Sequence, residues 1–171
     1  ASSLVLTVDA AGRTWTLERP ADLESLWQAM DDSDPEAEEH IPYWVELWPA
    51  TLALCGWLAR QDLAGRTCLD LGCGLGLSAL VASGLGARVV GMDYERDALY
   101  FAARNARLNA VPQPLWLCMD WNRPGFAPRA FDRHLAGCPG LDGRREVPGP
   151  RLGRVRSKQT APGAAFETPG E

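Results

Sequence analysis

Residues 67–77 read TCLDLGCGLGL and decide the fold of this 171-residue chain. A short apolar run, interrupted only by Asp70, leads into a turn with glycine at Gly72, Gly74 and Gly76, and an apolar helical stretch follows. Glycine is needed where the backbone must take a positive φ in a tight turn or approach a ligand closely. The stretch therefore predicts a strand, a nucleotide-binding loop and a helix, with an ordinary tight turn as the alternative.

The spacing of the glycines separates two kinds of nucleotide-binding loop. Dinucleotide-binding folds use G-x-G-x-x-G, whose third glycine would fall at Leu77. The pattern here is D-x-G-x-G-x-G, from Asp70 to Gly76, and it resembles motif I of the class I S-adenosylmethionine (SAM) dependent methyltransferases. The resemblance implies SAM as the cofactor, with Asp70 and the glycines shaping its pocket. An NAD-dependent oxidoreductase is the weaker alternative because Leu77 is not glycine.

A second strand is predicted over residues 87–92, ARVVGM, and it ends at Asp93. Asp93 lies 17 residues after Gly76, close to the spacing at which Rossmann-type folds place an acid that accepts hydrogen bonds from ribose hydroxyls. We therefore expect Asp93 to bind the ribose of the cofactor. The alternative is a solvated acid at the end of a strand.

A third strand is predicted over residues 115–119, and it leads to Asp120 and Trp121. An acid at this strand end can accept a hydrogen bond from the adenine N6 amine, and a neighbouring indole can pack on the purine. We expect these two residues to hold adenine, with a turn acid beside a half-buried tryptophan as the alternative.

The stretch IPYWVELWPATLAL, residues 41–54, precedes the first strand. Pro49 is suited to the first turn of a helix, which we expect to run to about Gln61 and to be buried because it is apolar nearly all round. Trp44 and Trp48 lie just before this helix. We expect Trp48 to contact the cofactor, whereas Trp44 fits core packing and cofactor contact equally well.

The remaining patterns complete an α/β chain. They predict a β-hairpin from residues 4–8 and 14–17, a short helix after Pro20, helices over 77–83 and 95–109, and a fourth strand from Phe131. The expected fold is a Rossmann-like class I methyltransferase sheet with helices on both faces. We divide the chain into an N-terminal hairpin and helix (1–40), a SAM-binding half domain (41–137) and a tail (138–171).

Residues 41–137 resemble the seven-β-strand family of protein lysine methyltransferases, whose members include relatives of the electron-transfer-flavoprotein β-subunit lysine methyltransferase. The resemblance rests on VELWPATLAL (45–54), LDLGCGLG (69–76), the strand ending in Asp93, MDW (119–121) and FD (131–132). It implies methyl transfer from SAM to a protein lysine, with a small-molecule amine as the alternative acceptor. Cys138 and Leu141 stand where the family has an acid and a tyrosine, so no catalytic residue is carried over.

The chain changes character after Gly137. Residues 137–171 hold 7 glycines and 5 prolines and carry a net charge of +2, whereas the residues before them carry −7. Glycine and proline at this density predict disorder. The tail is either natural or the product of a changed reading frame near codon 138. Because no further strands are predicted after the fourth, the alternative function is that of a SAM-binding remnant without catalytic activity.

Composition narrows the classes of protein to which the chain can belong. A net charge of −5 argues against general nucleic-acid affinity, no stretch approaches the apolar length of a membrane span, and the first residues lack a signal-peptide pattern. Five scattered cysteines and two histidines predict no metal site and a reducing, cytoplasmic location. The acidic run 31–39 is a solvated loop or, alternatively, attracts a basic protein substrate.

Overall fold

The computed structural model describes residues 3–28, 42–120, 123 and 125–136. The acidic run 31–39, Trp121 and the predicted tail 138–171 lie outside these described residues.

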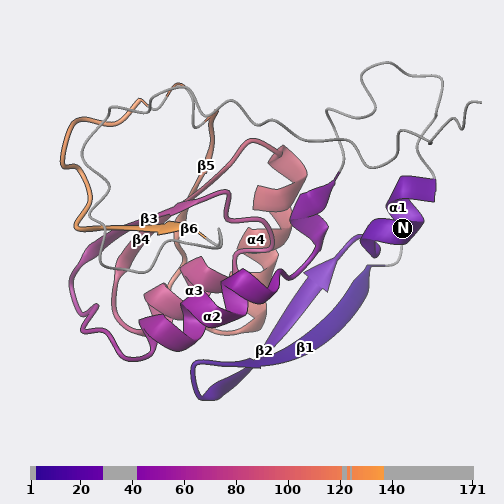
Figure 1. The fold of residues 1–171 in the computed structure, drawn as a ribbon, viewed down its shortest axis with the longest axis horizontal. Coiled ribbons are helices and arrows are strands. Elements are labelled where there is room, and N and C mark those ends of the chain that lie inside the picture. The colour runs from indigo at the N-terminus through magenta and orange to yellow at the C-terminus, as the bar shows by residue number, and fades with distance from the viewer. Residues whose placement is uncertain (1–2, 29–41, 121–122, 124, 137–171) are drawn as a thin grey trace, which may run out of the picture.

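A four-stranded parallel sheet forms the centre of the described chain (Figure 1). Its strands are β3 (Thr67–Leu71), β4 (Arg88–Asp93), β5 (Leu115–Cys118) and β6 (Arg133–Ala136), and they lie in the order β5-β4-β3-β6. Leu69 of β3 pairs with Val90 of β4 on one side and His134 of β6 on the other. The carboxyl ends of β3 and β4, where the glycine turn and Asp93 were predicted, therefore meet at one edge of the sheet.

Three helices cover this sheet: α2 (Pro49–Leu58), α3 (Leu77–Gly84) and α4 (Arg96–Leu108) (Figure 1). α3 contacts β3 and β4, α4 contacts β4 and β5, and α2 packs beside α3. Both crossovers run in the same direction across the sheet, so right-handed connections place α3 and α4 on the same face. The α/β Rossmann-like prediction is confirmed. The connection from β5 to β6 contains no helix within its described residues, so helices on both faces are not seen in this part.

The predicted hairpin is confirmed and is longer than expected. β1 (Leu4–Ala10) pairs antiparallel with β2 (Arg13–Arg19), and only Ala11 and Gly12 form the turn, with φ of 53° and 73°. Two positive φ values match the right-handed twist of the two strands, so a two-residue turn replaces the expected five-residue loop. The short helices α1 (Leu23–Gln28) and η2 (Tyr43–Val45) follow.

One hydrophobic core joins the hairpin to the sheet and its helices. Its members come from β1, β2, β3, β4, β6 and the three helices α2, α3 and α4, and the largest of them include Trp15, Leu17, Leu58, Leu80 and Leu135. Trp15 is anchored further because its indole N–H donates to the Ala10 carbonyl at 2.9 Å. The described chain therefore packs as one body around this core.

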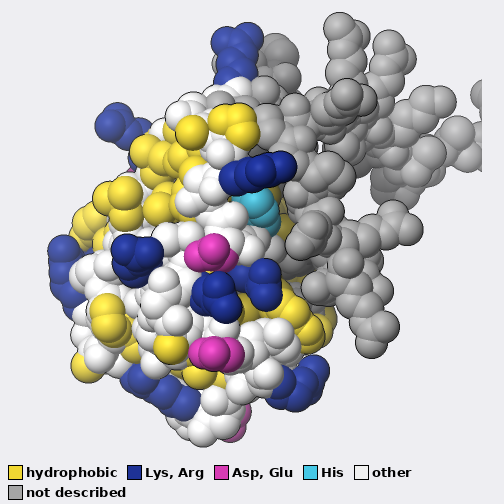
Figure 2. Space-filling view, turned by 90° about the vertical axis from the view of Figure 1, so that its left-hand side faces the viewer, with side chains coloured by type: hydrophobic (Ala, Val, Ile, Leu, Met, Phe, Trp, Pro, Cys, Tyr) yellow, Lys and Arg dark blue, Asp and Glu magenta, His cyan; other side chains and the backbone are white. Residues whose placement is uncertain are grey.

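The surface of one side is shown in Figure 2. Its basic side chains, which are all arginine among the described residues, are spread over the face with acidic and hydrophobic side chains among them. Among the described residues, no helix has the length and apolar character required to cross a membrane.

Candidate functional site

The turn after β3 needs glycine because of both its conformation and its neighbours. Gly74 and Gly76 have φ of 52° and 88°, as the sequence predicted. A Cβ on Gly74 would lie 3.1 Å from the Trp44 carbonyl oxygen, and one on Gly76 would lie 2.9 Å from the Ala102 Cβ. The bare backbone thus lets residues 42–48 approach the turn from one side and α4 from the other.

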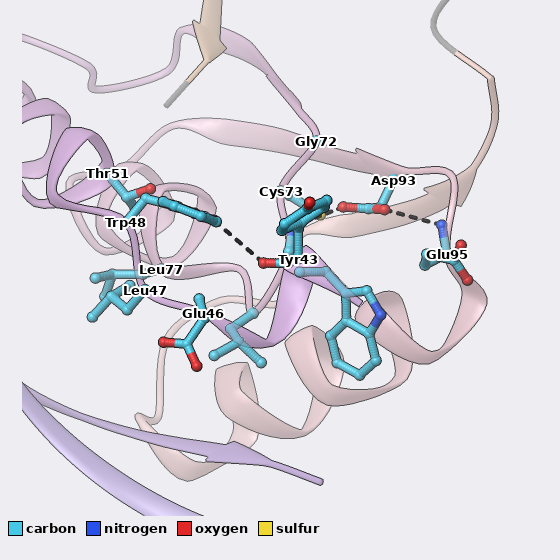
Figure 3. A pocket seen from close by; sticks show the side chains of 13 residues that line it. Tyr43, Glu46, Leu47, Trp48, Thr51, Gly72, Cys73, Leu77, Asp93 and Glu95 are labelled. Atoms are coloured by element: carbon cyan, nitrogen blue, oxygen red, sulfur yellow. Dashed lines mark hydrogen bonds between the residues drawn. The ribbon is translucent and has the colours of Figure 1, made fainter. Parts of the chain in front are cut away.

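Asp93, at the end of β4, is fixed by two backbone amides. The Gly74 N–H donates to Oδ2 at 2.9 Å, and the Glu95 N–H donates to Oδ1 at 3.0 Å (Figure 3). A carboxylate offers about four acceptor positions, and these two bonds leave the others available. Asp93 lines a cleft beside the glycine turn, so its carboxylate can accept hydrogen bonds from hydroxyl groups of a molecule bound there.

The cleft has a volume of about 260 Å³. Gly72, Gly74 and Asp93 form one wall, and the segment before α2 forms the other (Figure 3). The lining residues that the sequence did not single out are Tyr43, Glu46, Leu47, Thr51, Cys73, Leu75, Leu77 and Glu95. Tyr43 and Leu47 belong to the same aromatic stretch as Trp48, which was the available signal for them. The cleft is therefore built mainly of backbone, apolar side chains and a few acids.

Trp48 lies opposite Asp93, at the open side of the cleft (Figure 3). Its side chain is half exposed, its indole N–H donates to the Tyr43 carbonyl at 3.2 Å, and the two rings have centroids 6.2 Å apart. Trp44 also lines the cleft and packs against Phe101 of α4 with a centroid distance of 5.8 Å. Trp44 therefore lines the cleft and packs on α4, and its contact with a cofactor stays a prediction.

Asp70 is placed below the cleft rather than in it. It is only 1% exposed, and its Oδ2 accepts a hydrogen bond from the Ser78 hydroxyl at 2.7 Å. Burial raises the pKa of Asp70 to about 7, against the hydrogen bonds from Ser78 and the Ala79 amide, which lower it. Asp70 is not among the cleft-lining residues, so it shapes the site by holding the first turn of α3.

Of the two residues predicted to hold adenine, only Asp120 lies in the described part of the chain. Asp120 follows β5 at the same edge of the sheet, where the Met119 N–H continues the ladder by donating to the Asp93 carbonyl at 3.0 Å. Asp120 does not line the cleft, and Trp121 is outside the described residues. Gly76 also lies back from the cleft, because its neighbours are Ala102, Leu80 and Trp116.

The N-terminal part of the chain reaches the cleft wall through Glu46. The Glu46 Oε1 accepts hydrogen bonds from the Arg19 guanidinium at 2.8 Å and from the Leu23 N–H at 3.0 Å. Arg19 also donates to the Val45 carbonyl at 3.2 Å. The end of β2 thus holds the segment that carries Tyr43 and Trp48.

Four of the described cysteines are free, and the described residues form no candidate metal site. Among these residues, no three His, Cys, Asp or Glu side chains are grouped so that they could hold a metal ion. Cys55, Cys68 and Cys73 are buried free thiols, and burial raises the pKa of Cys55 to about 12. Cys118 is also free and is exposed.

Comparisons with known proteins fit this geometry. The sequence model of the ribosomal protein L11 methyltransferase (PrmA) family matches residues 49–132, from α2 to the start of β6. The ribosomal protein L11 methyltransferase of Alteromonas mediterranea is 36% identical over 110 residues, which is 59% of this chain and 38% of that protein. The one of Vibrio parahaemolyticus is 42% identical over 76 residues, 43% of this chain and 26% of that protein.

A solved structure extends the likeness to more of the chain. The 16S rRNA N2 G1207 methyltransferase of Thermus thermophilus, in complex with AdoMet and guanosine, has a TM-score of 0.59 and 20% identity. The likeness covers 80% of this chain and 33% of that one. This chain thus spans between about a quarter and two fifths of the length of these relatives.

The fold, the glycine turn and these matches define the chain as having a class I SAM-dependent methyltransferase fold. Within that class, the curated proteins that it is similar to include ribosomal protein L11 methyltransferases. This corrects the narrower resemblance drawn from the sequence, since these relatives are not named for the electron-transfer flavoprotein. The shared aromatic and glycine motifs mark the fold, and they do not distinguish its protein-modifying branches.

Proposed function

We propose that this chain binds SAM in the cleft beside the glycine turn and transfers its methyl group to a protein lysine. The observation that carries the proposal is the Asp93 carboxylate, which is held by two loop amides and keeps free acceptor positions at the cleft. SAM supplies a methyl group activated by its positive sulfonium. The protein's part in such a displacement is to align donor and acceptor and to exclude water.

The residues present fit this cofactor. Asp93 would accept hydrogen bonds from the ribose hydroxyls of the cofactor. The turn at Gly72 and Gly74 has no side chains, so it would let the cofactor lie close to the protein backbone, and Trp48 would cover the cofactor from the open side of the cleft. A side chain at position 74 would be crowded by Trp44, which supports a steric need for glycine. The adenine contacts of Asp120 and Trp121 stay predictions.

NAD is the less suitable cofactor. Leu77 stands where a dinucleotide loop has its third glycine, and here it begins α3 and is 1% exposed. Its buried side chain fills the position at which a glycine would allow close helix and strand packing. This favours SAM over NAD for the same cleft.

The acceptor is inferred from the relatives, which are named for a ribosomal protein. A lysine amine must be neutral to attack the methyl group, so a base must accept its proton. We assign this role to no residue of the described chain. A ribosomal-protein acceptor agrees with a cytoplasmic location, which we also propose.

Calorimetric titration of the full chain with SAM and, separately, with NADH tests the cofactor. We expect SAM to bind, NADH not to bind, and Asp93→Ala to weaken SAM at least tenfold, because it removes charged hydrogen bonds worth roughly 1.5–3 kcal/mol. Asp97→Ala is the matched control, since Asp97 is an exposed acid on α4 that does not line the cleft. Equal SAM affinity in both variants would contradict the role of Asp93.

Transfer of labelled methyl from SAM tests the acceptor. We expect label in purified ribosomal protein L11 and its loss when the lysines of L11 are first blocked chemically. Label that survives the blocking would exclude lysine, and label only in small amines would favour the alternative acceptor. SAM binding without any transfer would support the non-catalytic remnant.

A further inference from the structure

Asn105 of α4 and Asn109, the residue that caps the carboxyl end of α4, take the place of a neighbouring strand beside β2. β2 pairs with β1 along one edge, and the amide of Asn109 meets Thr16 at the other edge. The Thr16 N–H donates to Asn109 Oδ1 at 2.9 Å, and Asn109 Nδ2 donates to the Thr16 carbonyl at 2.7 Å. An asparagine amide carries one acceptor and one donor group, as a peptide does, so it can pair with a strand edge.

Asn105 repeats this arrangement one helical turn earlier. The Glu18 N–H donates to Asn105 Oδ1 at 2.7 Å, and Asn105 Nδ2 donates to the Glu18 carbonyl at 3.2 Å. Four residues of helix rise about 6 Å and two residues of strand about 6.8 Å, so the two asparagines match two successive outward-facing residues of β2. Both asparagines are buried, with 0% and 5% exposure. An ion pair between Glu18 and Arg104 flanks the contact.

Only Asn105 also reaches the glycine turn. The amide nitrogen Nδ2 has two hydrogens, and the second is donated to the Leu75 carbonyl at 3.0 Å. Leu75 lies between Gly74 and Gly76, and glycine has the least restricted backbone of all residue types. Asn109 instead makes its other bond to the Asn105 carbonyl within α4. One buried side chain therefore joins β2 to the turn, and its neighbour on the same helix holds β2 alone.

We propose that Asn105 is a positioning residue that fixes the Leu75 peptide and makes the SAM affinity of the turn depend on the N-terminal hairpin. This inference rests on the proposed function of the cleft. The Leu75 carbonyl and the Gly76 N–H belong to one peptide, and this N–H donates to the Cys73 carbonyl at 2.8 Å. The Cys73 carbonyl is part of the same peptide as the Gly74 N–H, which orients Asp93, so a shift of the Leu75 peptide is passed on to the carboxylate. The hairpin lies outside the stretch matched by the family, residues 49–132, and Asn105 links it to the glycine turn.

The test compares Asn105→Asp with Asn109→Asp in the full chain. Each aspartate keeps the size of the side chain and its acceptor for the β2 amide, and in its ionised form it cannot donate to a carbonyl. We expect both variants to unfold at a lower temperature, because both lose a bond to β2. Only Asn105→Asp should weaken SAM binding, by about tenfold or more, since a buried carbonyl loses its donor.

Hydrogen exchange of the turn in the SAM-free protein supplies a readout that does not need the cofactor. We expect residues 72–76 to exchange faster in Asn105→Asp and at the wild-type rate in Asn109→Asp. Equal exchange and equal SAM affinity in the two variants would overturn the inference. Failure of the wild type to bind SAM would instead overturn the proposed function, and exchange would still decide the coupling. If an aspartate variant does not fold, the uncharged pair Asn105→Ala and Asn109→Ala gives the same comparison.

Discussion

At the scale of single residues, Asp70 shows how the site depends on an acid that does not touch it. Its carboxyl is enclosed below the glycine turn and is bonded to Ser78, and burial raises its pKa to about 7. An unfolded aspartate titrates near 3.9. Between roughly pH 4 and pH 7 the folded protein therefore holds a proton that the unfolded chain has lost.

The variant Asp70→Asn tests whether the folded protein holds this proton. Stability falls with pH where the folded state binds more protons, so Asp70 destabilises the wild type progressively from about pH 4 to about pH 7 and by a constant amount above that range. The amide of the variant does not titrate, and it still accepts the Ser78 bond. In urea unfolding, the unfolding free energy of the variant relative to that of the wild type should rise by roughly 2–3 kcal/mol between pH 5 and pH 8. A constant difference over this range would mean that Asp70 is already charged in the folded protein.

At the scale of elements, β4, β5 and α4 fit together around Trp116 and a glycine. A Cβ on Gly91 of β4 would lie 2.3 Å from Cζ3 of the Trp116 indole, which no side chain tolerates without movement. The same indole also lies against Gly76. Gly91 thus makes room for Trp116, and Trp116 supports the turn from below.

Gly91→Ala should therefore cost about 1–3 kcal/mol of unfolding free energy, the usual penalty for overpacking a core. Gly56→Ala is the matched control, because Gly56 lies within α2 and nothing stands within 4 Å of its added Cβ. We expect this control to gain roughly 0.5–1 kcal/mol through helix propensity. Urea midpoints compare the two, and a Gly91→Ala variant as stable as the wild type would show that Trp116 has room to move.

The same elements show what local sequence can and cannot predict. The glycine turn, the strand ending in Asp93 and the start of a helix at Pro49 are found as predicted, because turn glycines and apolar periodicity act within a few residues. The prediction that this helix runs to about Gln61 and is buried was wrong, since α2 ends at Leu58 and only Cys55 and Leu58 are buried in it. The burial of Asp70 below the cleft was not foreseen, since a strand-end acid reads alike whether it faces a ligand or a helix. The pairing of Asn109 with Thr16 joins residues far apart in the chain, so no local sequence pattern predicts it.

At the scale of the whole molecule, the hairpin and the sheet share one core, although the sequence divides them at residue 40. Leu17 of β2 is fully buried, in the same cluster as Leu80 of α3 and Leu135 of β6. Asn105 and Asn109 add bonds across the same boundary. A contact surface that combines apolar packing with paired backbone groups favours unfolding in a single step.

Leu17→Ala distinguishes one cooperative unit from two. Replacing a buried leucine by alanine costs about 2–5 kcal/mol of unfolding free energy. If the described chain unfolds as one unit, this loss lowers the protection of every slowly exchanging amide. The amides of β3 are included, although β3 does not pair with the hairpin strands. Native-state hydrogen exchange measures both parts in one experiment. We expect the β3 amides to lose as much protection as those of β2. Protection lost in β2 alone would make residues 1–40 a separate unit, in which case the link through Asn105 would carry little of the stability of the sheet.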